Sequence, residues 1–258
     1  MVGLEEEGED LGKFKVESGK FKIMVFKGIQ KTSLIEYPGK IATVVFVGGC
    51  NFRCLICHNR DMVLFPQKLA DIPETEVLEH LNKRKGMVEA VVISGGEPTL
   101  YPELPEFIKK VKALDYLVEV ETNGTNPEMI KELIEQKLID YWAMDIKGPL
   151  SEPDLYAKIS GITDLDLINK VKQSVELIKN SGVAYEFRTT YVPDLLTEAD
   201  FDKIGQDLKG AKRYVIQGFR PVNNLDESFN AKLNWPPATF EKIKNDLSKY
   251  FGEIAIRN

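Results

Sequence analysis

The chain has 258 residues, of which 43% are hydrophobic and 29% are charged, so it is long enough to bury a core as one large domain or two small ones. Its formal net charge of -6 argues against a broad grip on nucleic acid or an anionic membrane, because such surfaces need excess Lys and Arg. No apolar run approaches the roughly 20 residues that span a bilayer. The acidic start MVGLEEEGED lacks the basic and apolar regions of a signal peptide. We therefore expect a globular cytoplasmic protein that is not bound to a membrane.

Residues 1–23 are rich in Glu, Lys and Gly and show no clear helical period. This composition predicts a loosely attached N-terminal extension, followed by a main domain over residues 24–258. The segment FKVESGKFKI alternates weakly between polar and apolar residues. An added edge hairpin is therefore the alternative interpretation of this region.

From Ile41 onward, short β-branched runs alternate with amphipathic stretches, which is typical of repeated βα units around a parallel sheet. The predicted strands are ATVVFVG ending at Gly48, EAVVISG at Gly95, YLVEVETNG at Gly124, DYWAMDIKG at Gly148, YEFRTTYVP at Pro193 and RYVIQGF at Phe219. Apolar residues at helical spacing predict helices over 104–114, over 129–138 and around 240–250. The short apolar segment EIAI closes the chain.

Local capping signals support these boundaries. Thr197 with Asp200 resembles a capping box at the start of a helix. Four glycines occupy positions where a left-handed cap is expected at the end of a helix: Gly86, Gly182, Gly210 and Gly252.

Six βα repeats are too few for a complete eight-stranded barrel, so the fold class is α/β with either a partial barrel or an open doubly wound sheet. Both architectures place function at the carboxyl ends of the strands. The distinctive polar sequences of this chain all begin there: GGCNFRCLICHN, SGGEP, ETNG, DIKG and QGFRP. We therefore expect them to gather around one site.

The three cysteines, Cys50, Cys54 and Cys57, form a CxxxCxxC loop directly after the first predicted strand. An odd number of cysteines within eight positions is a poor disulfide framework, whereas thiolates on one loop suit zinc or an iron–sulfur cluster. A Cys3His zinc site with His58 is one alternative, but zinc knuckles are normally small separate modules. Three ordinary buried cysteines are another, and these would be scattered over the strands. A four-iron cube held by three cysteines leaves one iron open, as a reactive centre requires.

The sequence SGGEP, Ser94 to Pro98, follows the second predicted strand. Its two glycines permit a tight turn and a close approach by a ligand, and Glu97 places a carboxylate at the strand end. An ordinary βα turn explains the sequence taken alone. The neighbouring three-cysteine loop favours a binding site.

With these motifs in hand, the chain resembles the radical S-adenosylmethionine (SAM) enzymes, and within them the activating enzymes of glycyl radical proteins. The resemblance covers nearly all of residues 24–258 and rests on CxxxCxxC followed by GGEP, on CHNRD from Cys57 to Asp61, and on KTSLIEYPGK from Lys31 to Lys40. The last segment is similar to the lead-in of activases for anaerobic ribonucleotide reductase or pyruvate formate-lyase. The resemblance implies a partial (βα)6 barrel of the radical SAM type.

The resemblance also implies the cofactors and their ligands. Cys50, Cys54 and Cys57 would bind a [4Fe-4S] cluster, and Gly95, Gly96 and Glu97 would hold the amino group of SAM. Thr122 and Asn123 in ETNG would be cofactor-binding residues. Asp145, Thr122 and Glu121 resemble a monovalent-cation site next to SAM, although the family pattern has Asp at position 121. Lys147 and Arg188 would lie near the carboxylate of SAM or the partner's peptide, with a barrel-interior ion network as the alternative.

Two further departures from the family pattern concern single residues. Ile56 replaces a residue that is often aromatic, so a backbone contact to adenine survives whereas stacking does not. A histidine of the formate-lyase activase pattern falls on Arg220. His58 is expected to pack or hydrogen-bond around the cysteine loop, and His80 to be a helix-surface residue.

The activity implied by the resemblance is reductive cleavage of SAM, with an electron from a donor such as flavodoxin or ferredoxin, to give a 5′-deoxyadenosyl radical. That radical would remove a hydrogen from one glycine of a glycyl radical enzyme, the protein partner. An oxygen-labile cluster further implies an anaerobic or microaerobic cytoplasm. One alternative is a radical SAM enzyme acting on a small molecule, a nucleoside or a peptide. Another is a non-catalytic iron–sulfur electron carrier, in which a cysteine would usually bind every iron and GGEP would have no role.

Overall fold

The structure of the chain is a computed structural model that describes residues 23–192 and 194–257. The predicted N-terminal extension, residues 1–23, therefore lies outside the described residues except for Ile23. No helix within these two ranges is long and apolar enough to cross a membrane.

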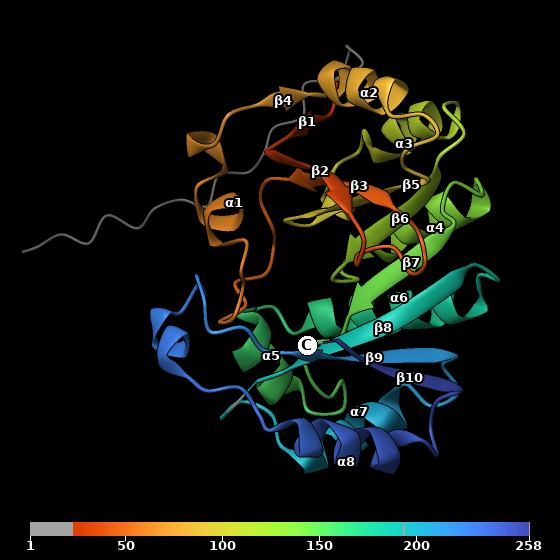
Figure 1. Cartoon of the computed structure of the whole chain (residues 1–258). Coiled ribbons are helices and arrows are strands. Elements are labelled where there is room, and N and C mark those ends of the chain that lie inside the picture. The colour runs from red at the N-terminus through yellow and green to blue at the C-terminus, as the bar shows by residue number, and fades with distance from the viewer. Residues whose placement is uncertain (1–22, 193, 258) are drawn as a thin grey trace, which may run out of the picture.

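An eight-stranded sheet forms the centre of the molecule (Figure 1). Its strands are, in spatial order, β10 (Glu253–Arg257), β9 (Arg213–Gly218), β8 (Ala184–Tyr191), β7 (Tyr141–Asp145), β6 (Leu117–Thr122), β5 (Ala90–Gly95), β3 (Ala42–Val47) and β2 (Gly28–Ser33). β2 pairs antiparallel with β3, and all other neighbours are parallel. The outer strands β2 and β10 do not pair with each other in the described part of the chain, so the curved sheet forms an open, partial barrel.

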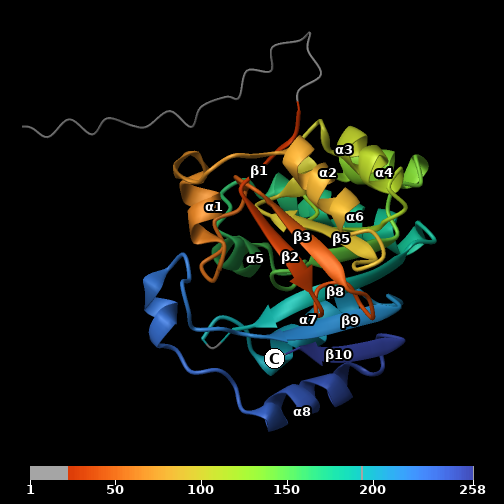
Figure 2. The same ribbon diagram turned by 45° about the horizontal axis from the view of Figure 1, so that its top comes forward.

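Helices cover the outer face of this sheet, as the two ribbon views show (Figures 1 and 2). They are α2 (Glu74–Lys83), α3 (Leu104–Lys112), α4 (Pro127–Glu135), α5 (Pro153–Ser160), α6 (Asp166–Asn180), α7 (Glu198–Asp207) and α8 (Pro237–Leu247). The short helix α1 (Arg60–Leu64) stands apart from the sheet, on the left of Figure 1. Short 3-10 turns occupy η1 (Pro66–Lys68), η2 (Pro98–Leu100) and η3 (Glu227–Ala231), and β1 (Val25–Phe26) pairs with β4 (Ile72–Pro73).

The six predicted strands are confirmed as β3, β5, β6, β7, β8 and β9, and the partial barrel is confirmed as the architecture. The capping box at Thr197 is also confirmed, since the Thr197 and Asp200 side chains each bond the other's backbone N–H. Gly86, Gly182 and Gly210 have the positive φ expected of helix caps. The prediction for Gly252 is wrong, because the chain there is already aligning with Ala211 and Lys212 to start β10.

The two faces of the sheet differ in chemistry. The outer face packs against the helices in one large apolar core, in which α3 buries Leu104, Phe107, Ile108 and Val111. The inner face carries only a small apolar cluster towards the amino ends of the strands, built around Tyr37 and Tyr141. Many of the remaining inner positions are polar, and those at the carboxyl ends of the strands form the candidate site.

Candidate active site

The cysteine loop, residues 48–59, connects β3 to α1 and is held in place from two sides. On one side, the Arg53 N–H donates to the Ser160 carbonyl at 2.9 Å, and the Leu55 N–H donates to the Ile159 carbonyl at 3.3 Å, both at the end of α5. On the other, the Asp226 N–H donates to the Leu55 carbonyl at 2.8 Å. Segments distant in sequence therefore fix the loop, which a CxxxCxxC pattern alone does not reveal.

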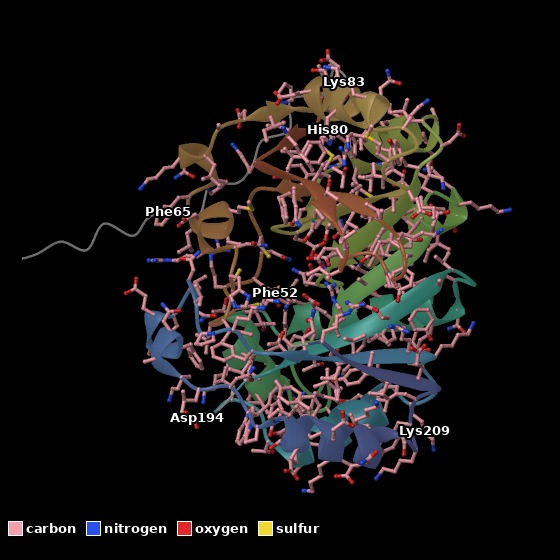
Figure 3. All side chains as sticks on the ribbon, in the orientation of Figure 1. Phe52, Phe65, His80, Lys83, Asp194 and Lys209 are labelled. Carbon is pink, nitrogen blue, oxygen red and sulfur yellow. The ribbon has the colours of Figure 1, made fainter. Side chains whose placement is uncertain are left out.

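The prediction for His58 is confirmed, whereas His80 is half-buried on α2 and its Nε2 atom is buried without a hydrogen-bond partner among the described residues. The Nε2 atom of His58 lies 2.9 Å from the Arg220 carbonyl oxygen and so hydrogen-bonds the loop to the segment after β9. Arg220 takes part through its backbone, and its side chain is not among those that line the cavity described next. His80 lies on α2, well away from the labelled Phe52 of the cysteine loop (Figure 3).

A cavity of about 260 Å³ opens at the carboxyl ends of the strands, and all of the predicted cofactor residues line it. From the cysteine loop these are Cys50, Cys54, Ile56 and Cys57, and from the strand ends Gly95, Gly96, Glu97, Glu121, Thr122, Asn123, Asp145, Lys147 and Arg188. The structure thus brings together side chains from five different loops or strands. Their individual roles stay predictions.

The three thiols suit an iron–sulfur cluster by their chemistry. All of them are free of disulfides, and all three line the same cavity. Burial raises the pKa of the Cys50 thiol to about 12 and that of Cys54 to about 11, so cationic iron would be needed to hold them as thiolates. Within the described residues, no group of three His, Cys, Asp or Glu side chains is arranged to hold a single metal ion.

The glycines of SGGEP allow close contact with the cysteine loop. The Gly96 N–H donates to the Val47 carbonyl and the Glu97 N–H to the Gly49 carbonyl, both at 2.9 Å. A Cβ atom on Gly96 would lie 1.7 Å from the Gly49 oxygen, and one on Gly95, where φ is +112°, would lie 2.4 Å from the Val47 oxygen. The sequence predicted a close approach by a ligand, whereas the structure shows that the chain's own backbone already requires both glycines.

The Glu97 side chain links the SGGEP turn to the end of β6. Its carboxylate, 1% exposed, accepts hydrogen bonds from the Thr99 N–H and hydroxyl at 3.0 and 2.6 Å, from the Thr122 hydroxyl at 2.8 Å and from the Asn123 N–H at 2.6 Å. Burial raises the pKa of Glu97 in spite of these donors. Its predicted contact with the amino group of SAM stays a prediction.

Arg188 bridges the two carboxylates that were predicted to hold a monovalent cation. Its guanidinium donates to Glu121 at 2.6 Å and to Asp145 at 2.9 Å, and Lys147 donates to Asp145 at 2.9 Å. Burial alone would raise the pKa of Asp145, but Arg188 and Lys147 outweigh it and hold that pKa at about 2. The ion network proposed as the alternative for Lys147 and Arg188 therefore exists. A cation between Glu121 and Asp145 stays a prediction, in a place where a guanidinium already lies.

Sequence reasoning missed three further lining residues, Glu36, Val63 and Thr190, and it included Gln217 only as the first residue of QGFRP. Thr190 pairs with Gln217 across β8 and β9, on the same sheet face as Arg188. The alternation of side chains between the two faces of β8 and β9 could have assigned Thr190 and Gln217 to the inner face, because residues two apart share a face. Glu36 lies in the Lys31–Lys40 segment, whose only signal was its similarity to other chains.

The comparisons with known proteins bear on what this cavity does. Residues 44–208 match the family model of the radical SAM superfamily. The chain belongs to the radical SAM superfamily. It is 35% identical over 233 residues to a protein of Methanocaldococcus jannaschii named provisionally as a glycyl-radical enzyme activating enzyme, covering 89% of this chain and 94% of that one. It is 28% identical over 238 residues to the pyruvate formate-lyase-activating enzyme of Clostridium pasteurianum, covering 88% of this chain and 96% of that one.

The fold comparison agrees with this membership. The crystal structure of Streptococcus suis SuiB bound to S-adenosylmethionine matches with a TM-score of 0.63 at 13% identity, covering 83% of this chain and 52% of SuiB. The chain thus spans about half of SuiB, and the likeness concerns the fold alone. Membership of the superfamily implies a radical SAM enzyme with a [4Fe-4S] cluster and SAM, and the three thiols and the polar cavity fit that pair of cofactors.

Proposed function

We propose that residues 24–258 form one radical SAM domain that generates a glycyl radical on a partner enzyme, such as anaerobic ribonucleotide reductase or pyruvate formate-lyase. The observation that carries this proposal is the nearly full-length similarity to two proteins named as activating enzymes. The cavity supports it, because the predicted cofactor residues all line one opening at the carboxyl ends of the strands.

In this proposal, the thiols of Cys50, Cys54 and Cys57 hold three irons of the cluster and leave the fourth for SAM. When bound, the cluster and SAM supply the chemistry, a one-electron cleavage of SAM that yields methionine and a 5′-deoxyadenosyl radical able to take the glycine hydrogen. The chain's own task is to bind, orient and shield these groups. No side chain is required as a general base.

The polar residues of the cavity divide the recognition of SAM. In this assignment Gly95, Gly96 and Glu97, which line the cavity, would accept hydrogen bonds from its ammonium group through backbone carbonyls and a carboxylate. Lys147 and Arg188 offer positive charge to its carboxylate, and both are held in place by Asp145.

Recognition of the nucleoside falls to other residues of the same cavity. Thr122 and Asn123 line it from the end of β6, and in this assignment they belong to the residues that bind SAM. The Ile56 backbone contacts adenine in this assignment, and its aliphatic side chain does not stack.

Two protein partners follow from this function. One is the glycyl radical enzyme, whose glycine must reach the cavity as an extended loop. The other is a one-electron donor such as flavodoxin or ferredoxin. A radical SAM enzyme that acts on a small molecule, a nucleoside or a peptide would use the same cavity, so the experiment has to separate the two.

The test is anaerobic and has two stages. The protein is reconstituted with iron and sulfide, reduced with dithionite and given SAM, and 5′-deoxyadenosine is measured. A candidate glycyl radical enzyme is then added, together with a matched control in which its radical-site glycine is replaced by alanine. A glycyl radical signal with the native partner alone supports the proposal. Cleavage of SAM without that signal on any candidate partner favours the other substrate classes.

A further inference from the structure

Asn123 follows β6 and is 6% exposed, and its side chain reaches the cysteine loop. Its amide nitrogen Nδ2 lies 3.7 Å from the Cys50 sulfur and 2.9 Å from the Asn51 Oδ1. The Cys50 sulfur also lies 3.3 Å from the Phe52 backbone nitrogen. A side-chain amide is thus directed at one of the three thiols, from a strand that is not adjacent to the cysteine loop in the chain.

The orientation of this amide is fixed by its neighbours. The Asn123 Oδ1 accepts from the Thr125 backbone N–H at 3.0 Å and from the Thr125 hydroxyl at 2.7 Å. A backbone N–H can only donate, so the oxygen of the amide must face Thr125 and the NH2 group must face the loop. One hydrogen of that group is used by Asn51, and the other is available to the Cys50 sulfur.

A ring of side chains holds this geometry. The Asn51 Nδ2 donates to the Thr125 hydroxyl at 2.8 Å, which closes a cycle of Asn123, Asn51 and Thr125. The Asn123 backbone N–H is also fixed, since it donates to the buried Glu97 carboxylate at 2.6 Å. The donor is therefore positioned by hydrogen bonds on both its backbone and its side chain.

We infer that Asn123 is a positioning residue for the cluster, whose side-chain N–H donates to the Cys50 thiolate and raises the reduction potential of the metal centre. A donor on a ligand sulfur stabilises the added negative charge of the reduced state more than that of the oxidised state. Asn123 thereby assists the uptake of the electron. This inference rests on the proposed cluster ligation by Cys50, and it does not depend on the identity of the partner.

The test is an anaerobic redox titration of the reconstituted protein, monitored by the EPR signal of the reduced cluster, with neither SAM nor partner present. Asn123→Leu removes the donor and is expected to shift the midpoint potential to more negative values at unchanged iron and sulfide content. Asn123→Asp keeps the size of the side chain and the acceptor for Thr125 but replaces the donor with an anionic oxygen, so it should shift the potential further in the same direction. Asn180→Leu, on α6 where the amide bonds only the Glu176 carbonyl, is the matched control and should not shift it.

Unchanged potentials in both Asn123 variants with a fully loaded cluster would overturn the inference while leaving the proposed function intact. Loss of iron from both variants would likewise overturn it, since Asn123 would then be needed for assembly and not for tuning. Wild-type protein that takes up no cluster would contradict both the proposed activase function and the role of Asn123. A shifted potential without any glycyl radical on a partner would leave the role of Asn123 standing and remove only the activase function.

Discussion

The two ends of the barrel interior use buried polar residues in different ways. At the carboxyl ends of the strands, the polar groups surround a cavity. At the amino ends, the fully buried Glu186 accepts from the Tyr141 hydroxyl at 2.9 Å and from Arg213 at 3.2 Å. Arg257, the last residue of β10, also reaches Glu186 with two nitrogens, at 2.6 and 2.8 Å. Glu186 and its partners satisfy one another's hydrogen bonds. Buried charge alone therefore does not identify the functional end of this barrel, whereas access to a cavity does.

Glu119 lies between these two regions and belongs to neither. It is completely buried, and neither carboxyl oxygen has a hydrogen-bond partner among the described residues. Burial, together with the nearby Glu121 charge, raises the pKa of Glu119 well above its ordinary value. The raised pKa favours the neutral form of Glu119, which does not itself line the cavity.

The largest expected effect concerns the carboxyl ends of the strands, where the cysteine loop lies. Replacing Cys54 with Ala removes one of three proposed cluster ligands, and we expect loss of stoichiometric iron together with loss of SAM cleavage. Iron and sulfide analysis and 5′-deoxyadenosine measurement check this. Full activity in Cys54→Ala would remove the cysteine loop from the site, and retention of stoichiometric zinc would favour the zinc alternative.

The attachment of the cysteine loop to α5 gives the next effect. Gly161 has φ +66°, and a Cβ atom there would lie 2.2 Å from the Arg53 carbonyl oxygen. Gly161→Ala should displace the loop and speed the loss of iron under chelator by about tenfold, given a strain of roughly 1–3 kcal/mol. Gly182→Ala is the matched control, because Gly182 has φ +77° with nothing within 4 Å. Equal iron loss from both variants would show that backbone strain, and not contact with the loop, is responsible.

A change at the amino ends of the strands should lower the stability of the fold without lowering the activity of the site. Arg213→Leu removes an ion pair of the fully buried Glu186 at the amino end of β9, and breaking such a buried pair costs roughly 3 kcal/mol. Urea denaturation should detect this loss, while SAM cleavage per folded molecule stays near that of the wild type. A fall in specific activity that matches a cavity variant such as Lys147→Ala would contradict the division of the interior into two regions.

The smallest effect is the pH dependence due to Glu119. Because its pKa is raised in the folded state, the stability that the neutral acid provides is complete below the unfolded pKa, near 4.5, and is lost as pH rises towards the folded value. Glu119→Gln should therefore gain stability relative to wild type as pH rises from 5 to 8, by at most about 1.4 kcal/mol per pH unit. Denaturation curves at several pH values check this, and a difference independent of pH would refute the assignment of a neutral Glu119.

Much of the fold was predictable because parallel strands buried on both faces read as continuous β-branched runs, as in EAVVISG for β5. β10 was harder to predict, since EIAI is short. A long segment and α8 also separate it in sequence from its neighbour β9. β2 was missed because Gly28–Ser33 is mostly polar and, within residues 23–192 and 194–257, pairs only with β3. These two strands form the edges of the open barrel, where burial leaves the weakest pattern.

The site was predictable to the extent that its residues stand in motifs. Cys50, Glu97 and Asn123 all follow strands in short polar sequences, and they line one cavity. The motifs could not predict which atoms are in contact. The dependence of Gly96 on the Gly49 carbonyl, and of the Asn123 amide on Thr125, arises from backbone approach between distant segments.

The proposed function requires this cavity to direct a radical at a glycine of a protein partner. The most direct measurement uses a partner enzyme labelled with deuterium at the α carbon of glycine, incubated anaerobically with the reduced, reconstituted protein and SAM. Mass spectrometry then follows the 5′-deoxyadenosine. Transfer of one deuterium into 5′-deoxyadenosine, together with a glycyl radical on the partner, is the predicted result. Formation of 5′-deoxyadenosine without deuterium, from a fully loaded cluster and with each candidate partner, would contradict the claim.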